Sequence, residues 1–275
     1  MIYFYIAGLS SAIPLVFKLV AYSIIFKKPH NFYGSFSFKL RKGCAGLLCF
    51  VEAVKPLFNF STSTEQQKEI IFYIVKLGQL IDDAFDNQYL SPQNFREIIL
   101  KKINNGNVNI QEILNTFSFF NAPSSNFYNQ FLDNIFKTWE THRVRDVRQK
   151  IGTKFSAKEV LEAAENRGSF YFLAVTYALN PTNWEPRFED SVKFAGSWFQ
   201  IIDDYSDQKK DIGRIDTPFT IDKNNSFSRF LELIKKYEKE IGDILKHKHP
   251  LIKFMKRISV LWLFLSKLSL SDWHN

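Results

Sequence analysis

Apolar residues along this chain recur mainly at the three- and four-residue spacing of helices, and the alternation typical of strands is sparse. Two capping-box signatures, Thr64 with Gln67 and Ser156 with Glu159, predict helix starts. Pro186 suits the first turn of a later helix. Because the connections are short, the pattern predicts an all-α chain with one domain over residues 1–275 and about ten helices. Beyond the first apolar segment, the predicted helices cover about 36–57, 64–88, one starting near 92, 109–119, 125–149, 156–179, 186–210, 226–246 and 251–270.

The two ends of the chain carry the most apolar segments. Residues 2–26 contain Lys18 as their one charge and are long enough to span a bilayer, but Pro14 and Lys18 lie in the middle of the segment. We therefore expect residues 1–30 to form a buried or membrane-resting helix rather than a span. The segment 251–270 is amphipathic and allows an interfacial helix. The expected location is the cytoplasm, with membrane association left open.

Two acidic strings stand in apolar surroundings, Asp82-Asp83-Ala84-Phe85-Asp86 and Asp203-Asp204-Tyr205-Ser206-Asp207 with Asp211. Their three- and four-residue spacings place carboxylates on shared helix faces, where like charges repel. Buried carboxylates need compensation, and a hard divalent cation prefers their oxygens. The pattern predicts magnesium held between two helices, against the alternative of solvated acidic faces. The predicted metal ligands are Asp82, Asp83, Asp86, Asp203, Asp207 and Asp211. The predicted catalytic residues are Asp82, Asp83, Asp86, Asp203, Asp204 and Asp207.

The segment 196–207, read as G-x-x-F-Q-x-x-D-D-x-x-D, resembles the second aspartate-rich motif of trans-prenyl diphosphate synthases. The first string resembles the D-D-x-x-D motif of those enzymes and of class I terpene synthases. Class IB terpene synthases look closer still, because their second motif is similar to the segment 204–211. The resemblance covers about residues 40–220. It implies the isoprenoid synthase fold, a helical bundle around a central active-site cavity, with three Mg²⁺ ions, or Mn²⁺ instead, at the two strings.

Departures from these families narrow the expected reaction. Chain-elongating enzymes carry an arginine pair after the first motif, where this chain has Asn87-Gln88-Tyr89-Leu90. The upstream segment that binds isopentenyl diphosphate has only a poor match at residues 41–43. The leading expectation is therefore a terpene synthase that ionises one linear allylic prenyl diphosphate and cyclises or rearranges the carbocation. The alternatives are a trans-prenyl diphosphate synthase, by elongation or head-to-head coupling, and a non-catalytic isoprenoid-binding subunit.

Side chains near the motifs supply candidate substrate contacts. Arg167 precedes Gly168, where we expect a helix break, and the resemblance suggests a diphosphate contact, with a surface salt bridge as the alternative. Gln200 is expected to orient a metal-bound water. A carbocation needs an aromatic-lined cavity, for which the 29 Phe of the chain offer many candidates. The predicted substrate-binding set is Arg167, Lys210, Arg214, Gln200, Phe72 and Trp198.

Charge and cysteine content limit the expected partners. The net charge of +8 suits an anionic small molecule or a membrane surface, and without a long basic run we expect no nucleic acid partner. Cys44 and Cys49 match neither a zinc spacing nor a disulfide framework, which indicates a reducing compartment. The expected partner is a small prenyl diphosphate, and a homodimer and peripheral membrane contact both remain open.

Overall fold

The regular elements of this protein are helices wherever the computed structural model describes the chain, at residues 38–86, 116, 126–221, 225–246 and 249–271. The predicted all-α class is confirmed for these residues, whose strand-like pairing amounts to one isolated bridge between Phe60 and Pro181. The helices are α2 (Phe38–Phe58), α3 (Thr64–Asp86), α6 (Asn126–Lys150), α7 (Ala157–Ala178), α8 (Pro186–Ser206), α9 (Gln208–Asp211), α10 (Ser226–Leu245) and α11 (Pro250–Ser271).

Local sequence signals explain several helix ends. Ser156 Oγ accepts a hydrogen bond from the Glu159 backbone N–H at 3.3 Å, and the Glu159 carboxylate accepts from the Ser156 N–H at 2.9 Å. This confirms the predicted capping box at the start of α7. Pro186 opens α8, where its missing N–H costs no helical bond.

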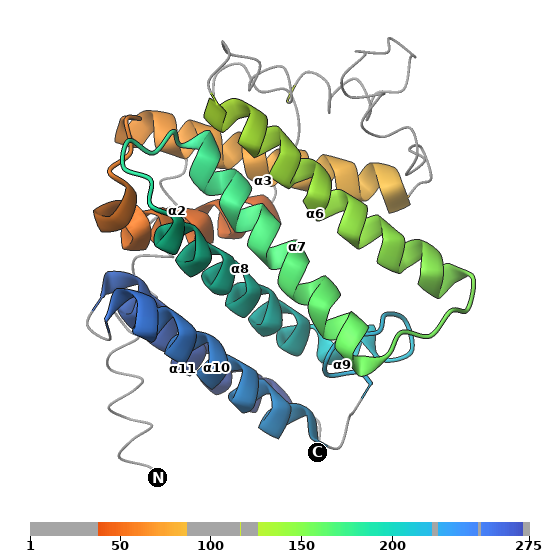
Figure 1. Cartoon of the computed structure of the whole chain (residues 1–275). Coiled ribbons are helices and arrows are strands. Elements are labelled where there is room, and N and C mark those ends of the chain that lie inside the picture. Colours follow the sequence, from red (N-terminus) through yellow and green to blue (C-terminus); the bar gives the residue numbers. More distant parts are fainter. Residues whose placement is uncertain (1–37, 87–115, 117–125, 222–224, 247–248, 272–275) are drawn as a thin grey trace, which may run out of the picture.

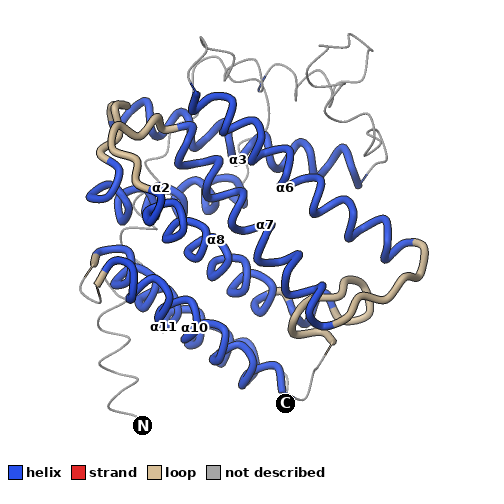
Figure 2. The backbone as a smooth tube through the Cα atoms, in the orientation of Figure 1, coloured by secondary structure: helices blue, strands red, loops and turns tan. Residues whose placement is uncertain are grey.

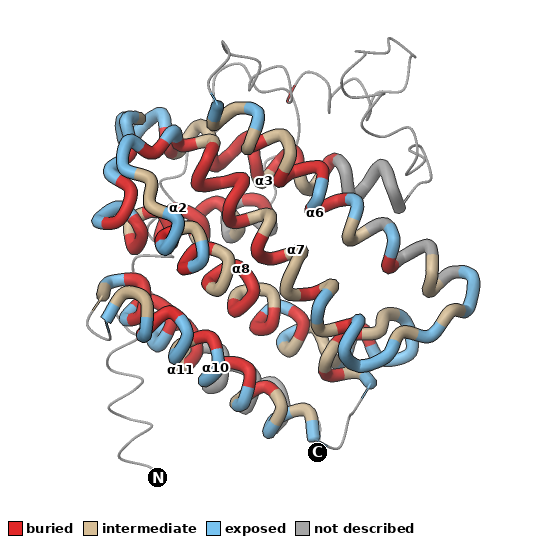
Figure 3. Tube along the Cα trace, viewed as in Figure 1, coloured by how far each residue is buried: buried red, intermediate tan, exposed pale blue. Residues whose placement is uncertain are grey.

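The long helices lie side by side, with α7 between α6 and α8, and α10 along the other side of α8 (Figures 1 and 2). Helix α2 packs against α3, and α11 contacts α2, α8 and α10. The helix faces turned toward neighbouring helices are buried (Figure 3). Because α7 and α8 are consecutive and antiparallel, the start of α7 and the end of α8 lie at one end of the bundle (Figure 1).

Helices α7 and α8 approach most closely at two glycines. A Cβ on Gly168 would lie 2.2 Å from the Gly196 carbonyl oxygen, and a Cβ on Gly196 would lie 2.3 Å from the Gly168 oxygen. Beside the glycines, Ser169 Oγ and Ser197 Oγ share a hydrogen bond of 2.9 Å. The predicted helix break at Gly168 is wrong, because α7 continues unbroken through it. The glycine serves close backbone approach, which fixes the position of Arg167 relative to α8.

The predicted helix over 186–210 is also interrupted. Helix α8 ends at Ser206, Asp207 caps it, and α9 forms a separate turn. The Ser206 hydroxyl donates to the Ile202 carbonyl at 2.7 Å, a side-chain bond that competes with regular helix bonding. Backbone hydrogen bonds nevertheless run from Asp207 N to Asp203 O and from Asp211 N to Asp207 O, each 3.0 Å. The four-residue spacing of the carboxylates therefore survives the break.

Several predicted segments lie outside the described residues. These are the N-terminal helix over 1–30, the helix starting near 92 and most of the helix over 109–119. Among the helices that are described, none combines the length and apolar character needed to cross a bilayer.

Candidate acidic site at the end of α8

The second acidic string ends α8 at the same end of the bundle as the start of α7. Asp204 and Asp211 are buried, Asp207 is half-buried and Asp203 is exposed. The Tyr205 ring stacks on Phe230 of α10 with centroids 4.2 Å apart, which anchors this end of α8 to its neighbour. The string therefore belongs partly to the protein interior, and the alternative of a fully solvated acidic face does not hold for it.

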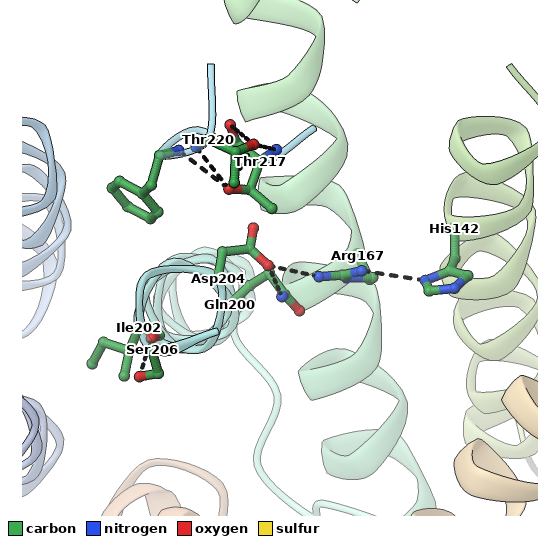
Figure 4. Close-up of polar contacts among 9 residues, drawn as sticks. His142, Arg167, Gln200, Ile202, Asp204, Ser206, Thr217 and Thr220 are labelled. Carbon is green, nitrogen blue, oxygen red and sulfur yellow. Dashed lines mark hydrogen bonds and ion pairs between the residues drawn. The ribbon is translucent and has the colours of Figure 1, made fainter. Parts of the chain in front are cut away.

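Asp204 is the best-supported carboxylate of the site (Figure 4). Its Oδ1 accepts hydrogen bonds from Arg167 Nη2 at 2.9 Å and from Gln200 Nε2 at 2.8 Å. Its Oδ2 is buried and has no hydrogen-bond partner within the part of the chain that is described. A buried carboxylate oxygen without a partner is costly, and a bound cation or a donor from a ligand would satisfy it. The structure thus brings three of the predicted site residues, Arg167, Gln200 and Asp204, into contact with one another, while their contact with a metal or a diphosphate stays a prediction.

His142 of α6 extends this network across α7 (Figure 4). Its Nδ1 lies 3.2 Å from Arg167 Nη1. Since a guanidinium has donors and no acceptor, Nδ1 must accept this bond, which assigns the imidazole proton to Nε2. Sequence reasoning missed His142 because a lone histidine on another helix carries no motif. Only the packing of α6 against α7 places it beside Arg167.

The carboxylates interact electrostatically. Desolvation raises the pKa of Asp203 from 3.8 to about 6, Arg167 counteracts the shift, and Asp204, Asp207 and Asp211 add to it. The Asp203 residue is exposed to solvent, but the protein around its carboxylate displaces part of the hydrating water, which disfavours the charged form. At Asp203, the positive charge of Arg167 therefore offsets the repulsion from the other carboxylates and the desolvation only in part. Such a site attracts divalent cations.

The remaining predicted contacts are spread more widely. Arg214 is exposed in the turn after α9, where its backbone N–H donates to the Asp211 carbonyl at 2.9 Å. Lys210 belongs to α9, but its side chain lies outside the described residues. Phe72 and Trp198 are buried in the hydrophobic core, where Trp198 packs against Phe254 of α11 with centroids 6.4 Å apart. Their contact with a substrate stays a prediction.

The first acidic string occupies the last turn of α3. The backbone of Asp82, Asp83 and Asp86 is helical, but their side chains lie outside the described residues. The carboxyl-terminal ends of α3 and α8 lie toward the same side of the bundle (Figure 1). Whether the two strings face each other stays a prediction.

The donors at this site suit magnesium by chemistry, although the described side chains do not complete a metal site. Within the described ranges, no group of three or more His, Cys, Asp or Glu side chains is arranged to hold a metal ion. The available donors are hard carboxylate oxygens, and Asp204 Oδ2 lacks a partner among the described residues. A complete set would need further carboxylates, and the first string is the sequence candidate for them.

A depression of about 460 Å³ opens between α6, α7 and α8, away from the acidic string. Phe170 and Tyr177 line it together with the paired side chains of Lys193 and Glu189, whose atoms are 2.7 Å apart. Phe72 and Trp198 do not line this depression. Its lining is too polar for a prenyl chain, so the predicted central cavity is not this one and stays a prediction.

Comparisons with known proteins returned no match to a family model, a curated protein or a solved structure.

Proposed function

We propose that this protein is a magnesium-dependent enzyme of the class I terpene synthase type, with the isoprenoid synthase fold. It would ionise a linear allylic prenyl diphosphate and cyclise or rearrange the carbocation. One observation carries the proposal: Asp204 is fixed by Arg167 and Gln200 through one oxygen, while its other oxygen is buried without a partner among the described residues. A carboxylate held this way, inside a string of four, is prepared for a cationic ligand.

The carboxylates of both strings would hold the metal. At the end of α8 and in the turn that follows, these are Asp203, Asp207 and Asp211, with Asp204 beside them. On α3 they are Asp82, Asp83 and Asp86. Bound Mg²⁺ would neutralise the diphosphate and stabilise its departure as an anion. The raised pKa of Asp203 reflects the cost of its negative charge at this position, and a bound cation would reduce that cost.

Arg167 would hold both the site and the substrate. Its guanidinium carries five donors in a rigid fork, so it can bind Asp204 and His142 and still donate to a diphosphate oxygen. The side chain is 17% exposed, which leaves an anion access to it. Gln200 keeps Asp204 oriented by donating to the same oxygen that Arg167 binds.

Two alternatives compete with this proposal. A trans-prenyl diphosphate synthase would need isopentenyl diphosphate and would release a longer diphosphate. A non-catalytic isoprenoid-binding subunit would bind the lipid without turnover. The poor match to the isopentenyl diphosphate segment favours the terpene synthase, and the retention of costly carboxylates favours catalysis over binding alone.

Incubation with geranyl, farnesyl or geranylgeranyl diphosphate and Mg²⁺, followed by mass spectrometry of an organic extract, tests the proposal. We expect a hydrocarbon or alcohol product without isopentenyl diphosphate. Asp207→Asn should abolish turnover, whereas Asp190→Asn, an exposed carboxylate near the start of α8, should leave it intact. Product elongation that requires isopentenyl diphosphate would replace the proposal with the synthase, and lipid binding without any product would favour the subunit.

A further inference from the structure

The depression of about 460 Å³ between α6, α7 and α8 combines an apolar floor with charged walls. Phe170, Leu173 and Tyr177 supply the floor, because α7 lies between the other two helices and these positions share one of its faces. Leu173 and Tyr177 are buried and Phe170 is half-buried. The volume is within the range of small-molecule sites in proteins, and the floor offers apolar surface to the body of such a molecule.

Each wall carries one ion pair at the same four-residue spacing. On α6, Lys137 Nζ lies 2.6 Å from an Asp133 carboxylate oxygen, and on α8, Lys193 Nζ lies 2.7 Å from a Glu189 oxygen. The four side chains are between 29% and 47% exposed, so a ligand in the depression has access to them. Partly exposed pairs of this kind are weak, which lets a charged ligand compete for both partners.

The two lysines lie toward the same end of the depression. Helices α6 and α8 run parallel, because α7 is antiparallel to both (Figure 1). Lys137 Nζ lies 5.7 Å from the centroid of the Phe170 ring, and the Lys193 backbone carbonyl accepts from the neighbouring Ser169 hydroxyl at 3.1 Å. Lys193 Nζ also lies 3.6 Å from Asp190, which is exposed and does not line the depression. The Phe170 end is therefore the cationic end.

The carboxylates lie toward the other end, one helical turn away. Glu189 Oε2 accepts from the Tyr177 hydroxyl at 3.0 Å, and Asp133 precedes its lysine by one turn in the same direction. Burial, reinforced by the Glu189 charge, raises the pKa of Tyr177, so its hydroxyl stays a donor. Gln130 lines this end too, and its buried Oε1 has no hydrogen-bond partner among the residues that are described. The Tyr177 end therefore gathers acceptors, one of which still needs a donor.

We infer that this depression binds a small zwitterion of the amino-acid class. The ligand ammonium would lie between Asp133 and Glu189, its carboxylate between the two lysines, and its apolar body on the α7 floor. Since the lining holds two charges of each sign at opposite ends, a singly charged ligand is attracted at one end and repelled at the other. A ligand with both charges is attracted at both ends. The inference does not depend on the proposed reaction, because binding requires neither Mg²⁺ nor a prenyl diphosphate.

Ligand-observed NMR titration of the full chain tests the inference. The probes are three zwitterions with increasing charge separation, leucine, 4-aminobutyrate and 6-aminohexanoate, each compared with the amine and the carboxylic acid of the same carbon skeleton. We expect the zwitterion that fits best to bind about tenfold more tightly than its own amine or acid, because each of these loses the attraction at one end. The length of that zwitterion then distinguishes an α-amino acid from a ligand with a longer spacer. If every zwitterion bound no better than its own amine and acid, the inference would be overturned.

Variants of the two ends give a second measurement. Lys137→Met with Lys193→Met should erase the advantage of the zwitterion over the amine and keep its advantage over the acid. Asp133→Asn with Glu189→Gln should do the reverse. The matched control is Lys68→Met on α3, whose ion pair with Glu65 at 2.7 Å lies outside the depression, and it should leave binding unchanged.

This crossed pattern separates ligand contact from structural damage, which would weaken all probes alike. Equal losses for amine, acid and zwitterion in both double variants, or an equal loss in Lys68→Met, would contradict the site. The comparison of probes on the wild type stands even where a double variant fails to fold, which circular dichroism would show.

Discussion

The crossing of α7 and α8 at Gly168 and Gly196 offers the sharpest test of how this fold builds its site. A Cβ on Gly168 would lie 2.2 Å from the Gly196 oxygen, whereas ordinary contact begins at 3.4 Å. Gly168→Ala therefore requires the two helices to separate locally by about 1.2 Å, the difference between these values. The adjacent Ser169–Ser197 hydrogen bond of 2.9 Å would lengthen beyond bonding distance.

The expected cost follows from these changes. Overpacking costs about 1–3 kcal/mol, loss of the serine bond adds about 1 kcal/mol, and the better helix propensity of alanine returns about 1 kcal/mol. We expect Gly168→Ala to lower the free energy of unfolding by about 2 kcal/mol. Because Arg167 is the neighbouring residue, the variant should also loosen its 2.9 Å contact with Asp204.

Urea unfolding followed by circular dichroism measures this cost. The matched control is Gly46→Ala in α2, where an added Cβ would meet nothing within 4 Å. That variant should gain about 0.5–1 kcal/mol, because alanine loses less backbone entropy than glycine on folding. If Gly168→Ala proved as stable as the wild type, or if both variants were destabilised alike, the close-crossing account would be wrong.

Three further predictions concern single side chains. Asp203 has a raised pKa of about 6 in the folded state, so the folded state binds more protons than the unfolded state between about pH 4 and 6. Stability should therefore fall as pH rises through this range, and Asp203→Asn should remove that slope in thermal melts. Ser156→Ala should cost about 1 kcal/mol in urea unfolding by removing the α7 cap. His142→Phe removes the acceptor for Arg167 Nη1 and should raise the KM for a prenyl diphosphate more than it lowers kcat, which steady-state kinetics would detect.

Local signals predicted much of the helical architecture. The capping box at Ser156 and the proline at position 186 mark helix starts that the structure confirms, because both signals act within one turn. The long predicted helices over 64–88, 125–149 and 226–246 agree with α3, α6 and α10 to within two residues at each end. Amphipathic periodicity is strong in α10 and α3, which makes these helices predictable from sequence, whereas it is weak in α6.

Features that depend on tertiary contact were not readable in this way. Gly168 looks like a helix breaker in isolation, and only the approach of α8 shows that its missing side chain is needed inside a helix. The end of α8 at Ser206 could not be predicted, because the carboxylates keep their four-residue spacing across it. The hydrogen bond from the Ser206 hydroxyl to the Ile202 carbonyl has no distinct signal in the sequence. His142 was missed because its partner is on another helix.

The central claim is that the carboxylates at the end of α8 bind magnesium together with a diphosphate. Thermal unfolding with and without Mg²⁺ and inorganic diphosphate tests it without a substrate. At ligand concentrations of about 100 times Kd, binding should stabilise the wild type by about 2.7 kcal/mol, raising Tm by several degrees. Asp207→Asn should lose this shift and Asp190→Asn should keep it. An unchanged Tm in the wild type, or an equal rise in Asp207→Asn, would contradict the claim.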